Sequence, residues 1–206
     1  MALWLIIVLA VGALGLGAML WWRLNPSACP YGLRIWVQVP HPIITRKRLL
    51  EILVPRSPER ILEIGPGTGY YTLDVAEAIA PRGRVDIFDL QQEMLDHTMR
   101  RAAERGIENL KPRQGDARDL PYGDNGFDAA FLVTVFGEIP DGDAALRELR
   151  RVVRPGGRIV VGELSLGDPH FTRLGTLRRR AEAAGLSFER HVGGSLGYFA
   201  RFTRQR

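Results

Sequence analysis

The sequence predicts an α/β fold, a doubly wound and mostly parallel sheet of seven strands preceded by one apolar helix. From about residue 59 to the C-terminus, short apolar runs alternate with stretches of helical spacing. That alternation is typical of a parallel sheet covered by helices on both faces. The apolar helix is indicated by the first 22 residues, which contain no charged side chain although 25% of the whole chain is charged.

The apolar N-terminal segment has the length of a membrane span. At about 1.5 Å of helix rise per residue it extends over about 33 Å, and a hydrocarbon core is roughly 30 Å thick. We therefore expect a single transmembrane helix over residues 1–22. The alternative is a cleaved signal peptide, which normally carries basic residues before its apolar run. No basic residue precedes the run in this chain.

The charges beside this segment are unbalanced. Residues 23–60 carry seven basic and two acidic side chains, whereas residues 61–206 carry 21 of each sign. Basic residues next to a membrane span tend to stay on the cytoplasmic side, so we expect a membrane protein with its domain in the cytoplasm. Because the excess charge is confined to one stretch, no nucleic-acid partner is expected. Cys29 is the only cysteine, which excludes a disulfide within the chain.

The chain is expected to divide into the apolar helix at 1–22, a basic linker at 23–55 with a short helix over 45–53, and a domain at 56–206. Within the domain, helix 143–153 places Leu146, Leu149 and Val152 on one face, with Asp141 or Asp143 as its N-cap. The other helices are expected at 71–80, 93–105 and 171–184. Strands are expected at 59–65, 84–90, 110–114, 127–136, 158–164, 186–191 and 198–202.

Gly65, Gly67 and Gly69 form a turn directly after the first strand of the domain, within LEIGPGTG. In an open parallel sheet, ligands bind beyond the carboxyl ends of the strands. Glycines allow positive φ and a close approach of ligand atoms, and the helix that follows offers free N–H groups. The spacing G-x-G-x-G differs from the dinucleotide pattern G-x-G-x-x-G. Glu63 would also repel a pyrophosphate, so the turn favours a ligand with a cationic amine or sulfonium.

Residues 59–164 resemble the class I, Rossmann-like methyltransferases that depend on S-adenosylmethionine. Within them, the resemblance is strongest to the branch that methylates quinone precursors and phospholipids. Four blocks occur in the family's order: LEIGPGTG at the glycine turn, DLQQEML at 89–95, GDARDLPYGDNGFD at 115–128 and LRELRRVVRPGGRIVVGE at 146–163. The resemblance implies a Rossmann-like methyltransferase fold with S-adenosylmethionine as the methyl donor.

The resemblance also implies which residues bind the donor. The glycines make room for its methionine part, and Glu63 supports their loop. Asp89 is implied to bind both ribose hydroxyls, a bidentate contact that suits a carboxylate. Asp116 is implied to accept a hydrogen bond from the adenine amine, with the ring near Leu90 and Met94. The full set is Glu63, Gly65, Gly67, Gly69, Asp89, Leu90, Met94, Asp116 and Ala117.

Methyl transfer depends mainly on the alignment of donor and acceptor, and no metal site is expected. A general base is needed only where the acceptor must lose a proton. Glu138 and Glu163, which follow or end the fourth and fifth strands, are the candidates for that role. Glu138 lies in VFGEIPD, which departs from the histidine- or asparagine-bearing form of relatives and leaves the acceptor open.

The predicted membrane helix favours a lipid-soluble acceptor, either a quinone precursor or a phospholipid amine. Two other functions remain open. One is a donor-binding scaffold without catalysis, suggested by the atypical VFGEIPD block. The other is an NAD(P)-dependent oxidoreductase on a similar fold, which the spacing of the glycines disfavours.

Overall fold

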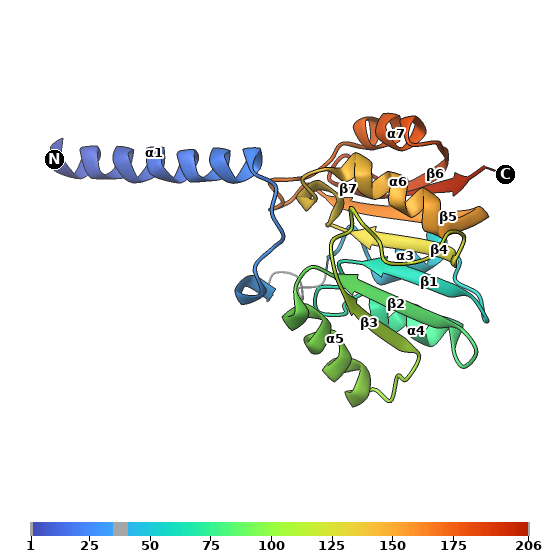
Figure 1. Cartoon of the computed structure of the whole chain (residues 1–206). Coiled ribbons are helices and arrows are strands. Elements are labelled where there is room, and N and C mark those ends of the chain that lie inside the picture. Colours follow the sequence, from blue (N-terminus) through green and yellow to red (C-terminus); the bar gives the residue numbers. More distant parts are fainter. Residues whose placement is uncertain (1, 35–40, 206) are drawn as a thin grey trace.

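A seven-stranded sheet in the order β3-β2-β1-β4-β5-β7-β6 forms the centre of the protein (Figure 1). The structure is a computed structural model that describes residues 2–34 and 41–205. β1 to β5 pair in parallel, and β7 runs antiparallel between β5 and β6. The expected mostly parallel sheet of seven strands is thereby confirmed. The strands are Arg60–Ile64 (β1), Arg84–Asp89 (β2), Leu110–Gln114 (β3), Phe127–Val133 (β4), Val153–Leu164 (β5), Leu186–Gly194 (β6) and Gly197–Arg204 (β7).

Helices cover both faces of the sheet and bury one apolar cluster on each. α3, α4 and α5 contribute to the cluster on one face, and α6 and α7 to the cluster on the other. This is the doubly wound arrangement that the alternating pattern predicts. Their bounds are Arg46–Leu53 (α3), Thr72–Ile79 (α4), Gln92–Glu104 (α5), Gly142–Val152 (α6) and Leu174–Ala183 (α7).

Side-chain caps fix where two of these helices begin. The Thr45 hydroxyl accepts a hydrogen bond from Arg48 N at 3.2 Å, which starts α3 inside the predicted range. Asp141, one of the two N-caps expected for α6, accepts from Ala144 N at 3.0 Å. Leu49, Ile52 and Leu53 of α3 are fully buried, so this helix belongs to the packed domain although the sequence pattern placed it in the linker.

The N-terminal segment forms a helix, α1 (Ala2–Leu24), but the predicted transmembrane span over residues 1–22 is not supported. α1 projects away from the domain with its apolar side chains exposed, for example Trp4 at 75% and Leu14 at 74% (Figure 1). Among the described residues, no helix is both long enough and apolar enough to cross a membrane.

The fourth strand ends earlier than predicted. Thr134 has a positive φ of 56°, which takes the backbone out of the β region, and Phe136–Glu138 form a 3₁₀ turn, η2. Strand β5 begins earlier than predicted, because Val153 pairs with Phe127 before the register shifts at a bulge. Of the linker expected at 23–55, residues 35–40 lie outside the described part, and Tyr31–Leu33 form a 3₁₀ turn, η1.

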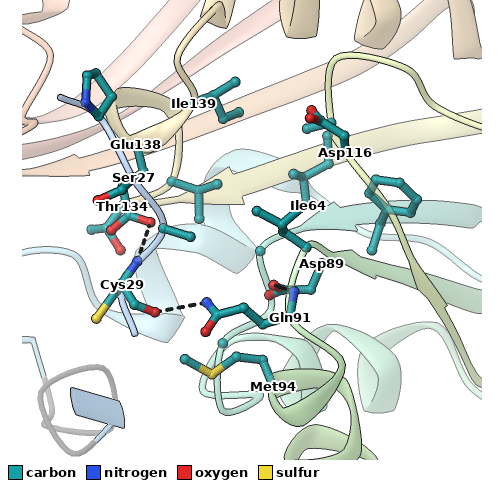
Figure 2. A pocket seen from close by; sticks show the side chains of 18 of the residues that line it. Ser27, Cys29, Ile64, Asp89, Gln91, Met94, Asp116, Thr134, Glu138 and Ile139 are labelled. Carbon is teal, nitrogen blue, oxygen red and sulfur yellow. Dashed lines mark hydrogen bonds between the residues drawn. The ribbon is translucent and has the colours of Figure 1, made fainter. Parts of the chain in front are cut away.

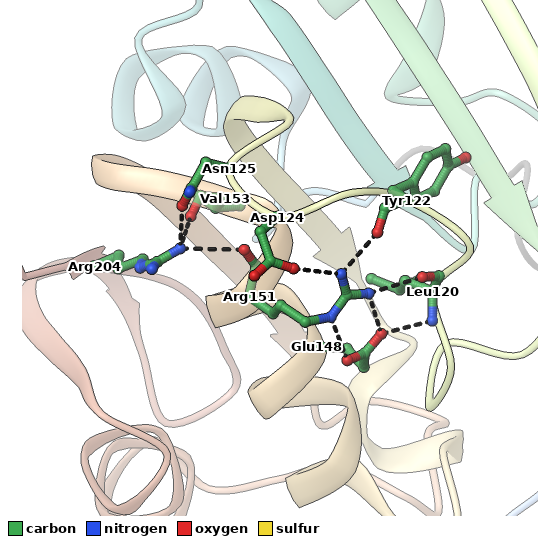
Figure 3. Close-up of polar contacts among 8 residues, drawn as sticks. All are labelled: Leu120, Tyr122, Asp124, Asn125, Glu148, Arg151, Val153 and Arg204. Atoms are coloured by element: carbon green, nitrogen blue, oxygen red, sulfur yellow. Dashed lines mark hydrogen bonds and ion pairs between the residues drawn. The ribbon is translucent and has the colours of Figure 1, made fainter.

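Arg151 in α6 holds the loop that follows β3 (Figure 3). Its guanidinium donates to the carbonyl oxygens of Tyr122 at 2.7 Å and Leu120 at 2.8 Å. It also pairs with Glu148 and Asp124, and Glu148 in turn accepts from Leu120 N at 2.8 Å. The planar guanidinium can serve several acceptors at once, so one side chain fixes a loop that has no regular structure of its own.

We predict that Arg151→Ala lowers the free energy of unfolding by about 2 kcal/mol, because several hydrogen bonds are lost together and two partly buried carbonyls lose their partner. Chemical denaturation measures the change. Arg147→Ala, on the same helix and with only a long ion pair of 3.9 Å, is the control and should change stability little. Equal destabilisation by the two variants would contradict the role given to Arg151.

Candidate active site

A cavity of about 370 Å³ lies beyond the carboxyl ends of β1, β2 and β4. This is the edge of a parallel sheet at which ligands bind, because the strand-to-helix loops gather there. Seven of the nine predicted donor-binding residues line it. Those seven are Gly65, Gly67, Asp89, Leu90, Met94, Asp116 and Ala117.

The glycine turn needs glycine for two separate reasons. Gly65, Gly67 and Gly69 all have positive φ, at 68°, 55° and 78°, which side chains disfavour. In addition, a Cβ atom on Gly65 would lie 2.3 Å from Val135 Cγ2, which is far inside van der Waals contact. The turn therefore brings bare backbone to the wall of the cavity. Gly69 has the same conformation but does not itself line the cavity.

Asp89 ends β2 and presents a carboxylate that is only 8% exposed. Its Oδ1 accepts a hydrogen bond from Gln91 N at 2.9 Å. Burial raises the pKa of Asp89 to about 6, and the backbone N–H groups of Gln91 and Gly67 oppose that rise. A buried carboxylate with acceptor capacity left over is suited to two adjacent hydroxyl groups, as a ribose offers.

Glu63 lies behind the turn and not on the cavity wall, and it is 2% exposed. Burial raises the pKa of its carboxyl group to about 8. A side-chain hydrogen bond with Thr72 opposes that rise. Glu63 therefore lies where it can support the glycine turn from behind, and it does not line the space in which a ligand would bind.

Asp116 follows β3 at the opposite side of the cavity and is engaged by Arg118. Arg118 Nη2 donates to Asp116 Oδ2 at 2.6 Å, and Arg118 Nε lies 3.0 Å from each carboxylate oxygen. These hydrogen bonds hold the pKa of Asp116 below its usual value. Asp116 is thus kept ionised as an acceptor at the place where the resemblance implies the adenine amine.

Glu138 extends from η2 into the cavity (Figure 2). Its Oε2 accepts a hydrogen bond from Cys29 N at 3.2 Å. Burial raises the pKa of Glu138 to about 8; the Cys29 N–H opposes this, and the charges of Asp168 and Asp89 reinforce it. A carboxyl group with this pKa is well placed to exchange a proton near neutral pH.

Glu163, the other candidate base, lies elsewhere. It is fully buried in β5, opposite Tyr198 in the sheet register, and is not among the cavity-lining residues. Its Oε2 accepts from Thr172 N at 2.8 Å. Burial raises the pKa of this carboxyl group well above its usual value. Its catalytic role stays a prediction.

The sequence patterns missed three features of the cavity. Residues 26–29, which precede the domain in the chain, line it together with Gln91 and Thr134. Nothing in the spacing of residues 26–29 indicated contact with a site more than 30 residues later. The positive φ of Thr134 also had no signal in the sequence, because threonine rarely adopts it.

The fold and the carboxylate-lined cavity define the chain as a Rossmann-like α/β protein with a ligand site at the carboxyl edge of its sheet. Residues 61–157 match the family model described as a methyltransferase domain. Over these residues the chain is therefore similar to a methyltransferase domain.

Individual relatives agree with this assignment. The chain is 34% identical to a demethylmenaquinone methyltransferase from Staphylococcus aureus (strain JH9), over 122 residues that make up 59% of this chain and 50% of the relative. It therefore spans about half the length of the curated relatives it matches.

Solved structures show the same fold. An S-adenosylmethionine-dependent methyltransferase from Aquifex aeolicus superposes with a TM-score of 0.78 at 19% identity, over 86% of this chain and 100% of the other. The [4+2]-cyclase SpnF superposes with a TM-score of 0.64 at 27% identity, over 71% of this chain and 57% of the other.

We predict that donor binding weakens as the pH falls through about 6, where Asp89 takes up a proton and loses acceptor capacity. Between pH 7 and pH 5 the affinity for S-adenosylhomocysteine should fall about tenfold. Calorimetry measures it. Asp89→Asn should bind weakly and lose this dependence, whereas Asp96→Asn, an exposed position on α5, should behave as the parent does. A parental pH slope in Asp89→Asn would rule out this carboxylate.

Proposed function

We propose that this protein transfers a methyl group from S-adenosylmethionine to a small, lipid-soluble acceptor, with the ring of a quinone precursor as the preferred class. Donor binding is assigned to the predicted residues that line the cavity, with Asp89 at the ribose and Asp116 at the adenine. The proposed acceptor class is supported by the demethylmenaquinone methyltransferase to which the chain is similar.

The acceptor side of the cavity carries the argument for an apolar substrate. Apart from Ser27, Cys29, Thr134 and Glu138, its wall is built from apolar side chains at the end of β4, on either side of η2 and in the segment 26–29. With a pKa of about 8, Glu138 is mostly protonated at pH 7 and offers little negative charge to an ammonium group. A neutral ring suits such a wall better than a phospholipid amine does. The apolar residues are Pro26, Ala28, Val133, Val135, Ile139 and Pro140.

In the reaction, an electron pair of the acceptor forms a bond to the methyl carbon while the bond from that carbon to the sulfonium sulfur breaks. S-adenosylhomocysteine leaves as a neutral thioether, and a proton is lost from the acceptor. Glu138 is the group positioned to take that proton once ionised. Alignment of the two reactants in a cavity of this size supplies the remaining rate enhancement.

The test uses the full-length protein, donor labelled in its methyl group, and a total lipid extract of membranes. We expect the label in the neutral quinone fraction. Label confined to water-soluble compounds would exclude a lipid-soluble acceptor. Label in the phospholipid fraction would instead select the amine class. Binding of donor without any transfer would favour a scaffold, an outcome that the likeness to a cyclase makes worth measuring.

We predict that Glu138→Gln lowers kcat about 100-fold, since a general base is lost. The parental rate should rise with pH and level off above about 8, because only the ionised carboxylate accepts a proton. The variant should show no such rise. Glutamine can still accept the Cys29 N–H, so the cavity wall is kept. Glu182→Gln, exposed on α7, is the control. A parental pH profile in Glu138→Gln would exclude the proposed base.

We further propose that the protein works at a membrane, with α1 as its point of attachment and the domain on the cytoplasmic side. The exposed apolar side chains of α1 and the basic residues at 23–60 support this. In flotation with anionic vesicles, the parent should rise with the lipid. The double variant Leu9→Lys and Leu14→Lys should remain in the soluble fraction while still binding donor. Flotation of both proteins, or of neither, would contradict attachment through α1.

A further inference from the structure

The segment between α1 and the domain crosses the mouth of the donor cavity. Residues 26–29 line the cavity, facing Glu138 on one side and Asp89 and Gln91 on the other (Figure 2). We call residues 26–31 the strap. It is an extended stretch that ends in η1, so it relies on contacts with the domain to keep its place.

Gln91 makes two of those contacts with one side chain. Its Nε2 donates to the carbonyl oxygen of Cys29 at 2.9 Å, and its Oε1 accepts from Tyr31 N at 3.1 Å. The primary amide thus pairs with the strap backbone as another strand would, using both its donor and its acceptor. Glu138 holds Cys29 N from the far side, and the Tyr31 hydroxyl lies 3.2 Å from His97 Nδ1.

Gln91 also occupies a position where a different residue would serve the helix better. It is the N-cap of α5, and its side chain makes no capping hydrogen bond. Serine, threonine, aspartate and asparagine are the residues that stabilise such a position. Glutamine there leaves an orphan N–H of the first turn without its cap and reaches outward to the strap. The contact with the strap is therefore what this residue type contributes.

The backbone of the same residue is tied to the donor site. Gln91 N donates to Asp89 Oδ1, the carboxylate predicted to hold the ribose. A donor bound at Asp89 would lie under the strap, since both line one cavity of about 370 Å³. The main-chain N–H of Gln91 thus contacts the donor site, and its side chain contacts the strap.

We propose that Gln91 is a positioning residue that fastens the strap over bound S-adenosylmethionine and thereby forms the acceptor-facing wall. Donor and product leave only when the amide releases Cys29 and Tyr31. Gln91 contacts neither reacting atom. It therefore affects how long the donor stays bound and the shape of the acceptor-facing wall. The inference depends on the cofactor and not on which acceptor is used.

Cys29 provides the measurement, because it is the only cysteine of the chain and lies in the strap. The rate of its modification by a maleimide is measured on the full-length protein with and without saturating S-adenosylhomocysteine. In the parent, the ligand should slow modification roughly tenfold, the scale of one or two hydrogen bonds. In Gln91→Ser this protection should be nearly lost, and the ligand should dissociate roughly tenfold faster.

The choice of serine separates positioning from stability. Gln91→Ser restores a good N-cap, so its melting temperature should equal or exceed that of the parent. Gln91→Asn, which caps well but is one methylene shorter, should lose protection in the same way. Gln92→Ser, at the next residue with its amide on Asp96, is the control and should keep parental protection.

Parental protection of Cys29 in both Gln91 variants would overturn the proposal. So would a parent in which the ligand binds by calorimetry yet leaves the modification rate of Cys29 unchanged. A failure of the acceptor assay with intact protection would count against the proposed function alone, and the role of Gln91 would stand.

Discussion

Burial of carboxyl groups at one edge of the sheet is the constraint on which the site depends. Desolvation raises the pKa values of Asp89, Glu63 and Glu138 there. Carboxyl groups in such positions destabilise the fold when ionised unless a cation or hydrogen-bond donors compensate. Asp89 and Glu138 line the cavity, so a bound ligand with a sulfonium and an ammonium group would favour their ionised forms. Ligand binding of this kind stabilises the folded state by mass action.

The sequence alone predicted the strands of the sheet and most of the residues on the donor side of the cavity. Alternating apolar runs predict every strand of the sheet, and the glycine turn with Asp89 falls at the carboxyl edge as predicted because parallel strands must end there together. Glycine at 65 is dictated by Val135, a contact between segments 70 residues apart that no local pattern contains. The local spacing of the glycines therefore located the turn. The contact with Val135 that makes glycine necessary at position 65 is visible only in the folded structure.

The remaining parts of the site come from chain segments without periodicity. Thr134 ends β4 early through a positive φ, and this places Glu138 on the cavity wall, where a longer strand would have carried it past. The strap reaches the cavity through hydrogen bonds from its backbone, which side-chain patterns cannot indicate. Glu163, the other candidate base, is fully buried and does not line the cavity, and its catalytic role stays a prediction.

The strap connects the N-terminal helix α1 with the donor cavity. α1 leads directly into the strap (Figure 1), and the strap lines the donor cavity, so whatever holds α1 also bears on the part of the chain that covers the site. The loop that carries Asp116 and Ala117 is held separately, by Arg151 of α6. The donor side of the cavity and the strap are thus fixed by different contacts.

A crystal structure of the full-length protein with S-adenosylhomocysteine tests the central claim most directly. The account predicts both ribose hydroxyls on the Asp89 carboxylate, the methionine part over the backbone of Gly65 and Gly67, and the thioether sulfur facing Glu138 beneath residues 26–29. A ligand bound elsewhere, or one whose ribose leaves Asp89 free, would contradict it.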